Sequence, residues 1–398
     1  MKHLIYIVIC ILLLCSCHKQ ENNNAEIEII DIDSRDKINF SDLFSEWHLI
    51  FPESKDSSFF GLEILRIEKY MDRLYLLNQK QTGKNILCFN LEGRFLFSID
   101  KIGNGPGEYT YLGDFFIDTK IDNIIISNEG NEWLYFDMDG NYLYSKRLPP
   151  ELQLDRYTRE FNDSLYITYC ECMDMTCTNI AFLDRNTLVP KHSIKPTSPS
   201  LSDFVPALSI SGNENAFFYY DGNDTIYNIS SDIGNKKPAY FADFGKKQQK
   251  FKQKLRMNNN EEFMNLFVKA FNNKEIRPTR SFLYNGKQIA INYSEYNSDN
   301  QQHTGPGLNF RNQIVFYDTH TKKSHNTTHI NFDIFNSVNI KKLTMVGCFD
   351  GYFYAIINSL LSEKEIQTML QSDYLSKDAK KMLLNMSEES NPIIMTFK

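Results

Sequence analysis

The chain has 398 residues, of which 14% are aromatic, and its formal net charge is −7. This length suits one large all-β domain, and the abundance of Phe and Tyr is typical of sheets that pack face to face. The sequence holds no block of basic residues, so nucleic acid is not expected as a partner, because phosphate binding needs clustered cations.

The N-terminus has the features of an export signal. A short basic start, Met1-Lys2-His3, precedes the apolar run Leu4–Leu14. Eleven apolar residues are too few to span a bilayer core of about 30 Å as a helix, but they match the hydrophobic region of a signal peptide.

The end of this run, Leu14-Cys15-Ser16-Cys17, resembles a bacterial lipobox, in which cleavage precedes a lipid-modified cysteine. Cleavage before Cys17 places the small Ser16 at the preceding position, whereas cleavage before Cys15 would place the bulky Leu14 there. We therefore expect residues 1–16 to be the signal peptide and Cys17 to carry palmitate and anchor the chain to a membrane, the outer membrane being favoured. The alternative is a plain secretory signal in which these cysteines are incidental.

The segment that follows is polar and rich in Asn, Asp and Glu. We expect residues 17–45 to be the lipidated cysteine and a tether, since about 28 flexible residues reach roughly 30 Å. The folded domain is then expected over residues 46–398.

A sequence motif that occurs twice indicates the fold. Cys88-Phe-Asn-Leu-Glu-Gly-Arg-Phe-Leu-Phe-Ser-Ile99 returns 47 residues later as Tyr135-Phe-Asp-Met-Asp-Gly-Asn-Tyr-Leu-Tyr-Ser-Lys146. Each copy predicts a β-hairpin with an acidic-Gly turn. A hairpin that recurs every 40–50 residues is typical of a propeller blade.

Six segments are predicted to be the second strand of a blade: 72–78, 122–128, 163–169, 214–220, 285–292 and 350–357. The wider spacings leave room for insertions. Residues 245–276 and 362–386 show helical periodicity, the second with a capping box at Ser362 and Glu365, and residues 294–311 form a polar loop. The sequence predicts an all-β, six-bladed β-propeller with two helical insertions.

The sixth blade has only three strands before the chain ends. The N-terminal residues 46–51 can supply the fourth by pairing with residues 392–397. Such closure leaves no open strand edge at the seam.

One loop connects this pattern to a known family. Gly103-Asn-Gly-Pro-Gly-Glu-Tyr109 resembles the G-x-G-P-G-E-Y phrase of six-bladed β-propeller lipoproteins from Gram-negative gut and environmental bacteria, which are related in architecture to NHL-type propellers. Asp224-Thr-Ile-Tyr227 resembles a second, weaker phrase of that family. The resemblance implies the fold, export and a recognition role, and it supplies no catalytic residues or cofactor.

The same loop holds the candidate ligand residues Asn104, Glu108 and Tyr109. It lacks the Lys-Ser/Thr pair and the following helix of a phosphate-binding P-loop. Its glycines also suit a tight connection between blades, so a purely structural role is the main alternative to ligand contact.

A second unusual segment contains Cys170, Cys172 and Cys177 together with two methionines. We mainly expect a disulfide or free thiols here, in an oxidising compartment. The alternative is a soft-metal site such as Cu(I), because thiols and thioethers are soft ligands. The spacing of the three cysteines matches no zinc module. Cys88 and Cys348 are expected as buried free thiols. His320, His325 and His329 are expected on a solvated surface, and no metal or cofactor is predicted.

Two functions remain open. The first is a binding or scaffolding module whose partner is an unknown ligand or an envelope protein. The second is an enzyme that acts on an extracellular glycan or another polymer at the propeller mouth. We label the strands of a blade A to D from the axis outward. All long segments then fall in D-to-A or B-to-C connections, which emerge on one face, and this face is expected to bind and to point away from the membrane.

The lipid anchor is directly testable. Metabolic labelling with palmitate is expected to mark the wild-type chain but not Cys17→Ser, since one modified cysteine carries all the acyl chains. Equal labelling of both chains would contradict the assignment, and Cys15→Ser serves as the control that keeps its label.

Overall fold

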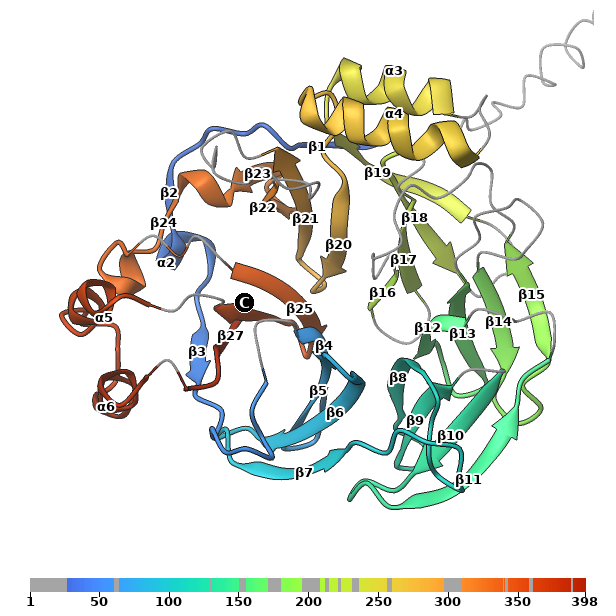
Figure 1. The fold of residues 1–398 in the computed structure, drawn as a ribbon. Coiled ribbons are helices and arrows are strands. Elements are labelled where there is room, and N and C mark those ends of the chain that lie inside the picture. Colours follow the sequence, from blue (N-terminus) through green and yellow to red (C-terminus); the bar gives the residue numbers. More distant parts are fainter. Residues whose placement is uncertain are drawn as a thin grey trace, which may run out of the picture.

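The structure is a computed structural model that describes residues 27–398, except for 61–63, 129–130, 150–154, 171–179, 195–207, 212–214, 221–222, 231–235, 256–259, 297–309, 339, 341–342, 358–360 and 388. Its strands form six blades around a central axis, which confirms the predicted six-bladed β-propeller (Figure 1).

The first three blades are regular antiparallel sheets of four strands. Blade 1 contains β4 (Ile64–Tyr70), β5 (Arg73–Lys80), β6 (Gly83–Asn90) and β7 (Phe95–Ile99). Blade 2 contains β8 (Leu112–Asp118), β9 (Asn123–Asn128), β10 (Glu132–Phe136) and β11 (Tyr142–Arg147). Blade 3 contains β12 (Asp155–Glu160), β13 (Leu165–Cys170), β14 (Ile180–Asp184) and β15 (Pro190–Ile194).

Blades 4 to 6 complete the ring, and blades 4 and 6 each include one strand from the N-terminal segment. Blade 4 contains β16 (Leu208–Ser211), β17 (Asn215–Tyr220), β18 (Thr225–Ser230) and β19 (Lys236–Asp243), with β1 (Glu28–Asp31) added outside β19. Blade 5 contains β20 (Thr279–Tyr284), β21 (Gln288–Tyr296), β22 (Phe310–Asp318) and β23 (Lys323–Asn326). Blade 6 contains β25 (Leu343–Phe349), β26 (Tyr352–Ile357), β27 (Ile393–Phe397) and β3 (Trp47–Ile50).

The six second strands β5, β9, β13, β17, β21 and β26 coincide with the six predicted segments. The first strands β4, β8, β12, β16, β20 and β25 lie nearest the axis (Figure 1).

The core lies between the blades. The described residues form one apolar cluster at each of the six contacts between neighbouring blades. Between blades 2 and 3, for example, the rings of Phe116, Trp133 and Tyr166 meet edge to face with centroids 5.2–5.5 Å apart. Such pairs are a favoured aromatic geometry, which explains why the sheets need so many aromatic side chains.

The ring closes as predicted. In blade 6, β3 pairs antiparallel with β27, with Ile50 opposite Ile394 and Trp47 opposite Phe397. The backbone of Ser45 and Glu46 also donates to the carbonyl of Lys398 at 2.9 and 3.2 Å. The two ends of the chain thus complete one sheet.

Residues 28–44, which the sequence analysis placed in the tether, lie against the propeller. β1 runs parallel to β19, and β2 (Ile38–Asn39) runs parallel to β24 (Ile330–Asn331). Ile30 and Ile32 are fully buried. Apolar residues that alternate with acidic ones give this segment a buried face, and that face fills the outer side of blades 4 and 5.

A short helix, α2 (Phe40–Leu43), follows β2 and inserts aromatic rings into the core. Phe40 and Phe44 pack within 4.5–5.3 Å of the ring of Phe397, measured between centroids. Two 3-10 turns, η2 (Thr327–His329) and η3 (Asp333–Phe335), lie between blades 5 and 6.

Both helical insertions are confirmed. The first holds α3 (Lys246–Leu255) and α4 (Asn260–Asn272), and the second holds α5 (Glu363–Met369) and α6 (Lys377–Leu384). The predicted capping box is present, since Ser362 accepts from the Glu365 N–H and Glu365 accepts from the Ser362 N–H. No helix in the described part of the chain is long and apolar enough to cross a membrane.

The connections differ between the two faces of the ring. We call the face with the A-to-B and C-to-D turns the short-turn face, and the opposite face the long-connection face. α3 and α4 lie between β19 and β20, a D-to-A connection, while α5 and α6 lie between β26 and β27, a B-to-C connection. Both insertions therefore belong to the long-connection face.

The repeated turns make a prediction about stability. Gly93 and Gly140 have φ of +87° and +81°, and a Cβ on Gly140 would lie 2.7 Å from the ring of Phe97. We expect Gly140→Val to lower the free energy of unfolding by about 1–3 kcal/mol, measured by denaturant titration. Gly286→Val is the control for the backbone alone, because Gly286 also has positive φ, +94°, but has no atom within 4 Å of its Cβ position. Equal stability of Gly140→Val and the wild type would contradict the hairpin geometry.

Ring closure is testable by truncation. Deleting residues 392–398 removes β27, which leaves the edges of both β26 and β3 without a partner. We expect an insoluble chain, because open strand edges and an uncovered apolar seam promote aggregation. A soluble, monomeric truncation with an unchanged melting temperature would show that the ring closes elsewhere.

Candidate functional site

A pocket of about 430 Å³ lies on the axis of the ring, lined by the A strands of all six blades. We call it the axial pocket. Its lining includes Tyr70, Thr119, Asn285 and Asp350, which belong to A-to-B turns or flank them. The pocket therefore reaches the short-turn face.

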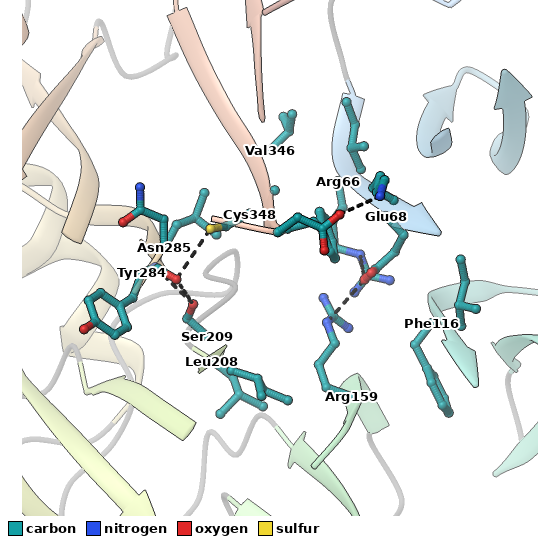
Figure 2. Close-up of a pocket in the computed structure, with 18 of the residues that line it drawn as sticks. Arg66, Glu68, Phe116, Arg159, Leu208, Ser209, Tyr284, Asn285, Val346 and Cys348 are labelled. Atoms are coloured by element: carbon teal, nitrogen blue, oxygen red, sulfur yellow. Dashed lines mark hydrogen bonds and ion pairs between the residues drawn. The ribbon is translucent and has the colours of Figure 1, made fainter. Parts of the chain in front are cut away.

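Four charged side chains from three A strands meet beside this pocket, and three of them, Arg66, Glu68 and Arg159, line it (Figure 2). The Arg66 Nη1 atom lies 2.7 and 2.8 Å from the two carboxylate oxygens of Asp114. Glu68 lies between the arginines, with its Oε1 atom 3.5 Å from Arg66 Nε and 3.3 Å from Arg159 Nε. We call Arg66, Glu68, Asp114 and Arg159 the axial ion cluster.

Burial within the axial ion cluster is uneven. The side chains of Arg66, Glu68 and Asp114 are 4–7% exposed, whereas that of Arg159 is 19% exposed. Burial lowers the pKa of Arg66, and the nearby positive charge of Arg159 lowers it further, while Asp114 and Glu68 oppose both effects. The Arg66 guanidinium also lies 4.8 Å above the ring of Phe115.

A fifth charged side chain, Glu160, lines the same pocket and is fully engaged by neighbours. Its Oε1 atom accepts from Arg185 Nη2 at 2.7 Å and from the Thr119 N–H at 2.9 Å, and its Oε2 atom accepts from the Thr119 hydroxyl at 2.8 Å. Arg185 also binds Asp118. Burial raises the pKa of Glu160, and the contacts with Thr119 and Arg185 oppose part of this rise.

The opposite wall is formed by blades 4 to 6 and is less charged. The Tyr284 N–H donates to the Ser209 hydroxyl at 3.0 Å, and the Cys348 thiol donates to the Tyr284 carbonyl at 3.4 Å (Figure 2). Burial raises the pKa of Cys348, so this thiol stays neutral and is a poor nucleophile.

A second pocket, of about 340 Å³, lies between blades 1 and 2 beside the connection from β7 to β8. We call it the loop pocket. Leu65, Ile102 and Tyr111 line it and are 43–52% exposed. Arg66 lines both pockets and Asp114 lines the loop pocket alone, so the axial ion cluster lies between the two pockets.

The predicted ligand loop folds on itself beside the loop pocket. The Glu108 carboxylate accepts from the Gly105 N–H at 2.8 Å, and the Glu108 N–H donates to the Gly105 carbonyl at 3.0 Å. A Cβ on Gly103 would lie 2.0 Å from the Glu108 carboxylate, which explains why glycine stands there. Asn104 and Glu108 are exposed.

Tyr109 does not present its side chain at the surface, in contrast to the expectation from the sequence. Its side chain is 1% exposed and packs in the core between blades 1 and 2. Its hydroxyl donates to the Lys84 carbonyl at 2.9 Å. The exposed aromatic residue is Tyr111, two positions later, which is 52% exposed and which the sequence analysis missed.

The cysteine segment lies mostly outside the described residues. Cys170 ends β13, and Cys172 and Cys177 are not among the described residues, so the disulfide and soft-metal interpretations stay predictions. Cys88 and Cys348 are free thiols. The described part of the chain contains no group of three side chains suited to a metal ion. His325 is buried rather than solvated, and burial lowers its pKa.

The second family phrase has a structural role. Asp224 is buried and accepts from Lys252 Nζ and from the Tyr219 hydroxyl, both at 2.6 Å. Gln248 adds contacts of 3.1 and 3.2 Å to the same carboxylate. Lys252 and Gln248 lie on α3, so Asp224 fixes this helix to blade 4.

The model of the family described as Domain of unknown function (DUF4934) matches residues 26–398. The chain belongs to this family. No curated protein matches the chain.

Two solved structures have a similar fold. The "Putative exported protein" of Bacteroides fragilis NCTC 9343 has a TM-score of 0.68 and 19% identity, with 93% of this chain and 99% of that chain covered. A member of the DUF4221 family from Bacteroides vulgatus ATCC 8482 has a TM-score of 0.53 and 10% identity, with 89% of this chain and 98% of that chain covered. At these identities the similarity shows the fold alone, and the relation to NHL-type propellers stays a prediction.

Proposed function

We propose that this member of the DUF4934 family is an exported lipoprotein, anchored through Cys17 in the outer membrane, that binds a ligand or an envelope protein through its long-connection face. Export is supported by the signal-like N-terminus and by the fold shared with a protein described as exported. The anchor rests on the lipobox resemblance.

The observation that carries the binding role is the loop pocket. Three large apolar side chains, Leu65, Ile102 and Tyr111, are each more than 40% exposed and line the same hollow. Soluble chains seldom group such side chains at the surface without a partner. Asn104 and Glu108 lie in the adjoining loop and add polar groups at its rim.

Binding is favoured over catalysis by the state of the carboxylates. An enzyme acting on a glycan usually needs two carboxyl groups that can exchange protons or attack the substrate. In the axial pocket, Glu68 is shared by two arginines and Glu160 is held by Arg185 and Thr119. Three hydrogen bonds within the chain occupy both oxygens of Glu160, so this carboxylate is engaged by the protein rather than open to a substrate.

The path of the N-terminal segment supports the proposed orientation. β19 leads into α3 on the long-connection face, and β1 runs parallel to it. The chain before residue 28 therefore comes from the direction of the short-turn face. Ten residues lie between Cys17 and Glu28, and the eleven steps from one to the other span at most about 40 Å. An anchor at Cys17 would thus hold the short-turn face toward the membrane.

Photo-crosslinking in intact cells tests which face binds. Ile102 on the long-connection face and Ile121 on the short-turn face are both 46% exposed, which makes them a matched pair. We expect Ile102 replaced by benzoylphenylalanine to give a discrete crosslinked adduct, and the same replacement of Ile121 to give none. Tyr111→Ala is expected to reduce the yield at position 102 by about fivefold or more, because it removes a large contact surface.

The opposite result, an adduct at position 121 and none at 102, would contradict the assignment of the binding face. Thermal unfolding of each variant controls for the fold.

A further inference from the structure

We propose that the axial pocket binds an oxyanion, the carboxylate or phosphate group of a small molecule, and that Arg159 is its principal anchor. This site is separate from the proposed partner-binding surface, because it opens at the short-turn face and shares with the loop pocket only the buried cluster between them. Anion binding in the axial pocket does not require a partner to bind at the loop pocket.

Arg159 is the loosely paired member of the axial ion cluster. Its contacts to Glu68 and Asp114 are 3.3 and 3.4 Å long, longer than the usual 2.7–2.9 Å of a charge-assisted hydrogen bond. Its one short contact, at 2.6 Å, is to the neutral carbonyl of Thr158. Asp114 is already held by Arg66 at 2.7 Å, so neither carboxylate fully engages Arg159.

The cluster has more donors than acceptors. Two guanidinium groups carry ten N–H donors in all, whereas the four oxygens of two carboxylates offer about eight lone-pair sites. Arg66 is 95% buried at its side chain, and its Nε and Nη2 atoms, like the Glu68 Oε1 atom, have no hydrogen-bond partner. Buried polar groups without partners are destabilising, and Arg159, as the more exposed arginine, is the member of the cluster that an added acceptor can reach.

The remaining charges of the pocket do not repel an anion. Glu160 is compensated by Arg185. Asp350 binds Lys69 at 2.5 Å, and its side chain is 65% exposed at the mouth, where water screens it. Since the axial ion cluster itself carries two positive and two negative groups, the pocket wall is close to neutral and presents an excess of N–H donors.

The shape of the pocket suits a small molecule with one charged end. In Figure 2 the Arg159 side chain points toward the Arg66 and Glu68 side of the pocket, and Leu208 lies beside it. Ser209, Tyr284 and Asn285 lie across the space and offer polar groups for the rest of the ligand (Figure 2). Arginine is well suited to such a role because its planar fork binds two oxygens of one carboxylate or phosphate at once.

Isothermal titration of the exported chain with inorganic phosphate, with succinate and with uncharged glycerol tests the proposal. We expect one or both anions to bind at millimolar concentration and glycerol not to bind. The anion with the higher affinity shows whether the site prefers a phosphate or a carboxylate group. Arg159→Gln is expected to weaken the anion's affinity about tenfold or more, since a hydrogen bond to a charged group is lost.

Arg73→Gln is the matched control. Arg73 likewise places its Nη1 atom on a backbone carbonyl, that of Met138 at 2.5 Å, and on an aspartate, Asp139 at 3.0 Å, but it lines neither pocket. We expect this variant to bind the anion as the wild type does. Should Arg159→Gln fail to fold by circular dichroism, Arg159→Lys keeps the charge without the fork and is expected to show the same loss.

Three results would overturn the proposal. They are the absence of binding by either anion, equal binding of glycerol, and wild-type affinity in a folded Arg159→Gln or Arg159→Lys chain.

Discussion

The pairing of β3 with β27 is the constraint on which the rest of the structure depends. Each blade packs only on its two neighbours, so six apolar clusters stay covered only while the ring is complete. Blade 6 completes it with strands from opposite ends of the chain, which turns an open row of sheets into a closed one. The position of the A strands around the axis, and hence the axial pocket, follows from that closure.

Buried charge also gathers near the axis of the ring. Arg66, Asp114 and Arg159 come from three different blades and compensate one another only in the closed ring. Buried ion pairs are weak evidence for stability, because desolvation offsets their attraction. Because the hydrogen bonding of these groups is incomplete, the cluster fits a role in ligand binding better than a role in stabilising the ring.

Features set by local sequence were predictable. The glycine turns at Gly93 and Gly140 and the Ser362 capping box depend on residues a few positions apart, and the six second strands follow a repeat. Features that depend on distant register were not predictable. The polar composition of residues 28–44 gave no sign that they pair with β19 and β24. The axial ion cluster joins side chains that are 48 and 45 positions apart in the sequence, and no local pattern links them. Tyr109 was misplaced because burial at a strand entrance depends on the neighbouring blade.

The N-terminal strands also fix the order in which the chain can fold. Glu28 pairs with Tyr240, Ile38 with Ile330, and Ile50 with Ile394, so the earliest part of the folded domain finds its partners only in the second half of the chain. Contacts of such high sequence separation form slowly, because a long loop must close before they are made. Until those partner strands exist, the N-terminal segment keeps its apolar face, which includes Ile30 and Ile32, uncovered. An unfinished chain therefore exposes strand edges and apolar side chains through which two incomplete copies can associate.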